Sequence, residues 1–437
     1  MNDIYDYTTF NEQSISDYTS IDDDLDDAID FLRDPDSFRS FEKGLKELLR
    51  RKGYSNTSDD KEMADFLISK LRVIHSAIEN ETVYAWFSGK HRPKIEAGSR
   101  LKMYEICFAL HLDHKETIWF FNHVYYDRAF NCHTIDEAVF HFAFLHGNTY
   151  QEALDIIAAV NNAVSIDKLK GEPAPNYTQF LRSRISELQS TEELTDFLIA
   201  NKEAFNTWNN SALYTLTDLV QELTGEKEAK SKVDNLKRML VRKLKSNTTL
   251  KDLGSINIHD YYDCGLLIRE ILFDAQNASD TSPAEFILEA IGGRSIQKNT
   301  FILDRILCTV SGMPKNTDIP YLVKNNFPSK KVMSDVLDES KISVSRSYDS
   351  IRKTIVLLDF YTFWVSIKLG ITDISDLNKD NLSKIYLEEA NDRLCQCGYE
   401  DLYAGNPYDW IFLCSSQSED PLAFFRAYIA DLLPADF

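Results

Sequence analysis

The chain has 437 residues, of which 43% are hydrophobic and 27% charged, so it can bury a core in each of two or three domains, and general disorder is excluded. It contains no run of about 18 uncharged apolar residues, and its polar, acidic N-terminus lacks the features of a signal peptide. We therefore expect a cytoplasmic protein without a membrane partner. Its net charge of −21 argues against nucleic acid unless positive charge is concentrated locally.

The fold class follows from the spacing of the apolar residues and from the low numbers of glycine and proline. Apolar residues recur at helical spacings of three and four from end to end, and there are only 15 glycines and 11 prolines. These features predict an all-α protein. The seven cysteines are odd in number and lie in apolar contexts, which indicates reduced core thiols and not a disulfide framework.

Charge is distributed unevenly along the first hundred residues. Residues 1–36 hold twelve acidic residues against one arginine, and they predict a mobile acidic arm with one possible helix at 25–32. The arm would be a solvated tail, or alternatively it would fold over the next segment and compete with DNA. Residues 37–102 are the locally basic part, with fourteen lysines and arginines against nine acidic residues.

Five short helices are predicted within residues 37–126. Their expected starts lie near Ser37, Lys61, Glu81, Ser99 and Asp113, the last because Asp113 and Glu116 have the spacing of a capping box. The third helix is the most informative. It places Val83, Trp86 and Phe87 on one face, ends at Gly89, and is followed by a basic turn and a proline.

A helix that reads DNA needs one apolar face to hold it in its domain and one face of short or polar side chains to enter the major groove. The candidate base-reading residues on the outer face are Thr82, Tyr84, Ala85 and Ser88. The candidate phosphate-binding residues in and after the turn are Lys90, His91, Arg92 and Lys94. The plainer alternative is a surface helix whose basic end complements the helix dipole.

These residues resemble the Cro/C1-type, XRE-like helix-turn-helix regulators. The resemblance covers residues 38–112 and rests on Thr82–Trp86 as recognition helix, on Gly89–Pro93 as the following turn, and on a fourth helix that ends at residues 106–112. It implies a helix-turn-helix domain over residues 37–126, a homodimer on double-stranded DNA, and a bacterial source.

After residue 126 we expect a helical hairpin or connector over 127–172, a helical domain over 173–250 and a C-terminal helical domain over 251–437. The segment 171–175 predicts a linker. The basic helix expected at 227–244 is a surface helix or a secondary contact to the DNA backbone. Residues 329–353 hold two short helices at helix-turn-helix spacing, a second candidate reader that runs into a helix, 354–364, apolar on all sides.

The sequence lacks four common nucleotide-binding and catalytic motifs. No G-x-G-x-x-G, P-loop, H-E-x-x-H or G-x-S-x-G pattern occurs, so we expect no enzyme and no cofactor. The histidines at 75–146 and the pair Cys395 and Cys397 lack a matching ligand set, so we expect no metal and interpret these residues as core or surface side chains.

Two hypotheses follow. The first is a sequence-specific DNA-binding transcriptional regulator, whose larger helical region dimerises or senses a protein partner. The second is an all-helical interaction scaffold, such as a phage-defence or stress component, that does not bind DNA. Glu79 and Glu81 at the start of the third helix and the acidic total favour the second; the local positive charge favours the first.

Overall fold

The computed structural model describes residues 7–19, 25–34, 36–54, 59–130, 132, 134–164, 177–202, 205, 210–225, 230–244, 256–277, 299–307, 326–338, 348–371 and 379–432. Every regular element within these ranges is a helix, which confirms the all-α prediction. No helix in the described ranges is long and apolar enough to cross a membrane. The expected linker at 171–175 lies outside the described residues.

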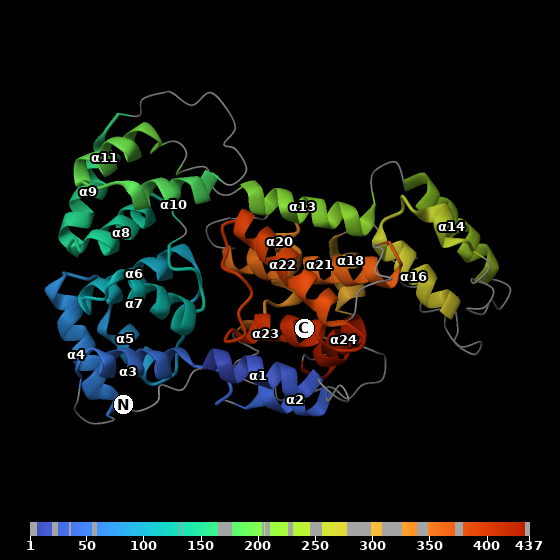
Figure 1. Cartoon of the computed structure of the whole chain (residues 1–437), viewed down its shortest axis with the longest axis horizontal. Coiled ribbons are helices and arrows are strands. Elements are labelled where there is room, and N and C mark those ends of the chain that lie inside the picture. Colours follow the sequence, from blue (N-terminus) through green and yellow to red (C-terminus); the bar gives the residue numbers. More distant parts are fainter. Residues whose placement is uncertain are drawn as a thin grey trace.

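Two hydrophobic cores divide the molecule into two lobes (Figure 1). The N-terminal lobe has one core that runs from Phe41 to Phe205, so the regions expected as a helix-turn-helix domain and as a connector share it. Its helices are α3 (Phe41–Arg51), α4 (Asp60–Val73), α5 (Asn80–Phe87), α6 (Ala97–Ala109), α7 (His114–Phe120), the π-helix η1 (Phe121–Tyr125), α8 (Ile135–His146), α9 (Tyr150–Asn162), α10 (Tyr177–Glu187) and α11 (Thr191–Ala200).

The C-terminal lobe gathers its helices around α21 (Tyr348–Lys368). The others are α13 (Asn210–Thr224), α14 (Lys230–Leu244), the 3-10 helix η3 (Ile258–Tyr261), α16 (Leu266–Asn277), α18 (Asn299–Ile306), α20 (Lys330–Val336), α22 (Lys379–Gln396), α23 (Pro407–Ser416) and α24 (Pro421–Leu432). Because α21 is apolar on all sides, it is buried along most of its length, as the sequence pattern predicted.

Local signals place several helix ends where the sequence indicated. The side chain of Asp113 accepts a hydrogen bond from the Glu116 backbone N–H, and Glu116 caps in return, which forms the predicted capping box of α7. Gly147 ends α8 in the left-handed conformation, with φ +75°, and α9 follows after two residues. These short-range rules explain why individual helices were predictable.

The segment expected to be a mobile acidic arm contains two packed helices in the structure. Residues 7–19 and 25–33 form the helices α1 (Tyr7–Thr19) and α2 (Leu25–Arg33), which pack on α23 and α24 (Figure 1). Trp410 stacks on Phe31 with ring centroids 4.8 Å apart, and its Nε1–H donates to the Asn11 carbonyl at 3.1 Å. The acidic residues of α1 and α2 whose burial is described are exposed, and the inner sides of both helices complete the C-terminal core, so residues 7–19 and 25–33 do not form a mobile tail.

The prediction of a second DNA-reading segment at residues 329–353 is also wrong. Its first helix is α20, but the described part of its expected second helix, residues 348–353, is the start of α21, in the middle of the lobe. Arg352 and Lys353 are 7% and 4% exposed and are paired with Asp409 and Asp349. Such side chains cannot reach a DNA groove, since they are held inside the core.

Candidate nucleic-acid interface

The surface that the sequence singled out is built on α4 and α5, which pack against each other and are joined by residues 74–79. Val83, Trp86 and Phe87 are at most 1% exposed, as the helical spacing predicted. Trp86 meets Phe41 of α3 edge-on, with ring centroids 5.8 Å apart. Burying these large side chains fixes the rotation of α5 about its axis and therefore decides which residues face outward.

The four candidate base-reading residues are spread around the part of α5 and its C-cap that is not fully buried, and Tyr84 also packs against the N-terminal core. Thr82, Tyr84 and Ala85 are half-buried, and Ser88 is exposed at the C-terminal end. Tyr84 is tied to its own lobe, because its hydroxyl donates to the Asp65 carboxylate of α4; this hydrogen bond raises the pKa of Tyr84. Beyond Tyr84, the outer surface of α5 is formed by the small, uncharged Thr82 and Ala85 and by the exposed carboxylate of Glu81 in the first turn.

Three of the four candidate phosphate-binding residues are at the surface. Lys90, His91 and Lys94 are exposed. They follow Gly89, whose φ of +67° is in the left-handed region; a Cβ there would also collide with the Glu42 carboxylate of α3. The tight turn therefore brings the basic residues back beside the C-terminal end of α5.

Arg92 is placed differently from its neighbours. Its Nη1 donates to the Asn326 side-chain oxygen at 2.5 Å, its Nη2 lies 3.5 Å from the Tyr125 carbonyl, and its guanidinium lies 5.3 Å from the centroid of the Tyr126 ring. Asn326 belongs to the C-terminal lobe and is 2% exposed. Arg92 therefore connects the turn after α5 to the other lobe.

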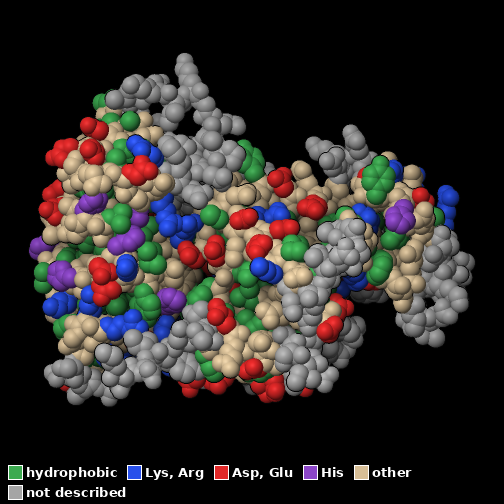
Figure 2. All heavy atoms as spheres, in the orientation of Figure 1, with side chains coloured by type: hydrophobic (Ala, Val, Ile, Leu, Met, Phe, Trp, Pro, Cys, Tyr) green, Lys and Arg blue, Asp and Glu red, His purple; other side chains and the backbone are tan. Residues whose placement is uncertain are grey.

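Much of the local positive charge is paired with carboxylates. Lys46 Nζ lies 2.7 Å from Asp60, and Arg51 lies 2.6 Å from Glu47. Figure 2 shows lysine and arginine side chains at the lower left, where Figure 1 places α3 and α4, and acidic side chains over much of the C-terminal lobe. Glu79 and Glu81 are exposed at the start of α5, so positive charge is concentrated at one end of the helix only.

Comparisons with family models, with curated proteins and with solved structures each found no match. The resemblance to helix-turn-helix regulators therefore rests on the residues of this chain alone. No group of three or more histidine, cysteine or acidic side chains in the described part of the chain is placed to hold a metal ion.

Proposed function

We propose that this protein is a DNA-binding transcriptional regulator in which α5 enters the major groove of double-stranded DNA. One observation carries the proposal: a short helix is held by three buried side chains, presents the short uncharged Thr82 and Ala85 outward beyond its acidic first turn, and is followed by an exposed basic turn. A recognition helix needs these three properties together.

The roles of the individual residues follow from their positions. Thr82, Ala85 and Ser88 meet base edges or thymine methyl groups, while Lys90 and Lys94 contact phosphates. Tyr84 serves mainly to brace α5 against α4, since its hydroxyl already bonds to Asp65. The protein binds as a symmetric dimer, as helix-turn-helix proteins generally do, and the C-terminal lobe supplies the dimer or partner interface.

A protein-interaction scaffold is the second candidate, and one surface feature favours it. A groove of about 890 Å³ lies between the end of α4, the start of α7 and the α8–α9 turn. Val73 on its edge is 72% exposed and Leu145 is 38% exposed. Exposed apolar side chains beside a groove are typical of surfaces that bind proteins.

A selection experiment tests the first proposal against the second. Purified protein is mixed with genomic fragments at low salt, and bound DNA is recovered and sequenced. We expect enrichment of particular sites, which Ala85→Glu abolishes because a carboxylate would face the groove. Ala158→Glu on the exposed side of α9 is the matched control and should leave binding intact. Absence of any bound fragment for the unaltered protein would overturn the regulator and leave the scaffold.

A further inference from the structure

The groove between the end of α4, the start of α7 and the α8–α9 turn has the size of a ligand-binding site. Its volume of about 890 Å³ lies within the range of about 300–1,000 Å³ that small-molecule sites occupy. All of its lining residues belong to the N-terminal lobe, and they include the first residues of the connection from α4 to α5. The groove is therefore a feature of one lobe, beside the helix that we propose to read DNA.

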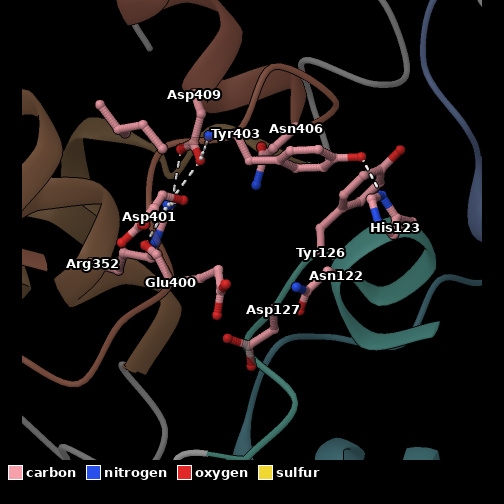
Figure 3. Close-up of a pocket in the computed structure, with 11 residues that line it drawn as sticks. Asn122, His123, Tyr126, Asp127, Arg352, Glu400, Asp401, Tyr403, Asn406 and Asp409 are labelled. Carbon is pink, nitrogen blue, oxygen red and sulfur yellow. Dashed lines mark hydrogen bonds and ion pairs between the residues drawn. The ribbon is translucent and has the colours of Figure 1, made fainter. Parts of the chain in front are cut away.

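The pocket between the two lobes is smaller and its polar groups are engaged (Figure 3). Its volume is about 170 Å³. Arg352 makes two 2.8 Å hydrogen bonds with Asp409, and the His123 ring bonds to the Tyr403 hydroxyl, as the dashed lines in Figure 3 show. These groups bond to one another and not to an occupant, so the groove is the better candidate for a ligand site.

Aromatic rings form the apolar wall of the groove. Phe108 of α6 stacks on Phe144 of α8 with ring centroids 4.2 Å apart, and the Tyr150 ring lies 5.3 Å from that of Phe108. The exposed Val73 and Leu145 extend this apolar surface to the rim. Because aromatic rings pack favourably against other rings, edge-on or offset, this wall suits a ligand with an aromatic body.

Three of the nine histidines of the chain line this groove. They are His75 after α4, His111 after α6 and His146 at the end of α8, and all three are exposed. Within the described part of the chain, no residue is hydrogen-bonded to their ring nitrogens. By contrast, the rings of His114 and His141 in the same lobe lie with Nε2 and Nδ1 3.4 Å apart. The three groove histidines therefore have polar atoms available to an occupant.

Two of these histidines stand where a glycine is more usual. His75 and His111 have φ values of +56° and +51°, and each follows the C-cap of its helix, α4 or α6. Helices commonly end in a left-handed residue at this position, and glycine adopts that conformation without the steric cost that a side chain carries. Two imidazoles are thus present beside one groove in spite of a backbone cost.

The groove carries little negative charge of its own. Asp113 is its one charged lining residue, and the Asp113 carboxylate caps α7 by accepting a 2.8 Å hydrogen bond from the Glu116 backbone N–H. The positive end of the helix dipole offsets this charge. An imidazole donates through an N–H in its neutral form and adds a positive charge when protonated. The rim therefore complements an anionic acceptor.

We propose that this groove binds a small aromatic carboxylic acid. The aromatic body of the ligand packs against Phe108, Phe144 and Tyr150, and its carboxylate accepts hydrogen bonds from the imidazole N–H groups of the rim. A metal ion does not fit, because the described residues form no cluster of three histidine, cysteine or acidic ligands. The binding needs no DNA, so it goes beyond the proposed function and is tested separately.

Calorimetry with phenylbutyrate as the probe tests the site in the full-length protein. We expect saturable binding with a Kd below about 1 mM. Leu145→Glu places a carboxylate at the rim and should weaken binding at least about tenfold. Ala158→Glu is the matched control, because it adds the same charge on the exposed side of α9 outside the groove, and it should change the affinity less than about twofold.

A neutral analogue tests the role of the histidines. Phenylbutanol has the same ring and chain but no carboxylate, so it should bind at least about fivefold more weakly than phenylbutyrate. Asparagine also tolerates the left-handed backbone, so His75→Asn/His111→Asn removes both imidazoles without breaking the helix ends. We expect this double variant to bind phenylbutyrate about fivefold more weakly and to bind phenylbutanol within about twofold of the unaltered protein.

The proposal is overturned if phenylbutyrate shows no saturation up to about 10 mM, a result that would leave the groove to the protein partner of the scaffold alternative. It is also overturned if Leu145→Glu binds phenylbutyrate as well as the unaltered protein does. Equal affinities for phenylbutanol and phenylbutyrate would overturn the assignment to an acid, and an equal loss of both in the double histidine variant would overturn the role of the imidazoles.

Discussion

The sequence predicts a pair of helices with basic residues nearby in two parts of this chain, residues 61–94 and 329–353, and the structure places the second helix of each pair in opposite surroundings. In the α4–α5 pair, only one face of the second helix is buried, and Lys90 and Lys94 follow it at the surface. In the α20–α21 pair, the second helix is buried on all sides, and Arg352 is held by Asp409. Helix spacing and positive charge do not by themselves identify a DNA-reading surface; the outer face must also be polar or small.

The largest expected effect is on the free energy of unfolding, and it tests whether the start of α21 belongs to the core of the C-terminal lobe. Asp409→Ala removes the ion-pair partner of the buried Arg352 guanidinium, and it also removes an acceptor for the Tyr403 backbone N–H. We expect a decrease of about 3–5 kcal/mol in the free energy of unfolding, measured by urea denaturation.

The control for this variant is an exposed pair. Lys384 and Glu388 lie 3.9 Å apart on α22, with 75% and 67% of their side chains exposed, and Glu388→Ala should cost less than about 1 kcal/mol. A decrease of similar size in both variants would show that Arg352 is not a buried core residue, and the contrast between the two helix pairs would fail.

A smaller effect should separate Arg92 from Lys90, which lie two residues apart. Arg92→Ala removes a hydrogen bond to the buried side chain of Asn326 and the contact of the guanidinium with Tyr126, so we expect a decrease of about 2 kcal/mol in stability. Lys90→Ala removes only an exposed side chain, and its cost should stay below about 0.5 kcal/mol. Equal stabilities of the two variants would contradict the placement of Arg92 between the lobes.

Much of the fold was predictable because it depends on short-range rules. The all-α class, the capping box at Asp113, the turn at Gly147 and the buried face of α5 all follow from spacing within about ten residues. The buried centre of α21 was also predictable, since no face of that segment is polar.

The rest depends on interactions between residues far apart in the sequence. The acidic composition of residues 1–36 suggested a mobile tail. In the structure the apolar inner sides of α1 and α2 pack against Trp410 and the helices α23 and α24. Arg92 and Asn326 are 234 positions apart, so no local pattern joins them. One signal was available in the first case: the helical spacing of Ala28, Phe31 and Leu32 in α2.

The most direct test of the proposed DNA-reading surface is the salt dependence of binding to a selected DNA fragment. Each lost phosphate contact reduces the slope of log K against log[salt] by about 0.9. The double variant Lys90→Ala/Lys94→Ala removes two contacts from each protomer of the proposed dimer, so it should reduce the slope by about 3.6. The control, Lys331→Ala/Lys384→Ala, removes the same charge from exposed positions of the C-terminal lobe and should leave the slope unchanged. Equal slopes for both double variants, or a slope near zero for the unaltered protein, would contradict the assignment of α5 and its turn to DNA.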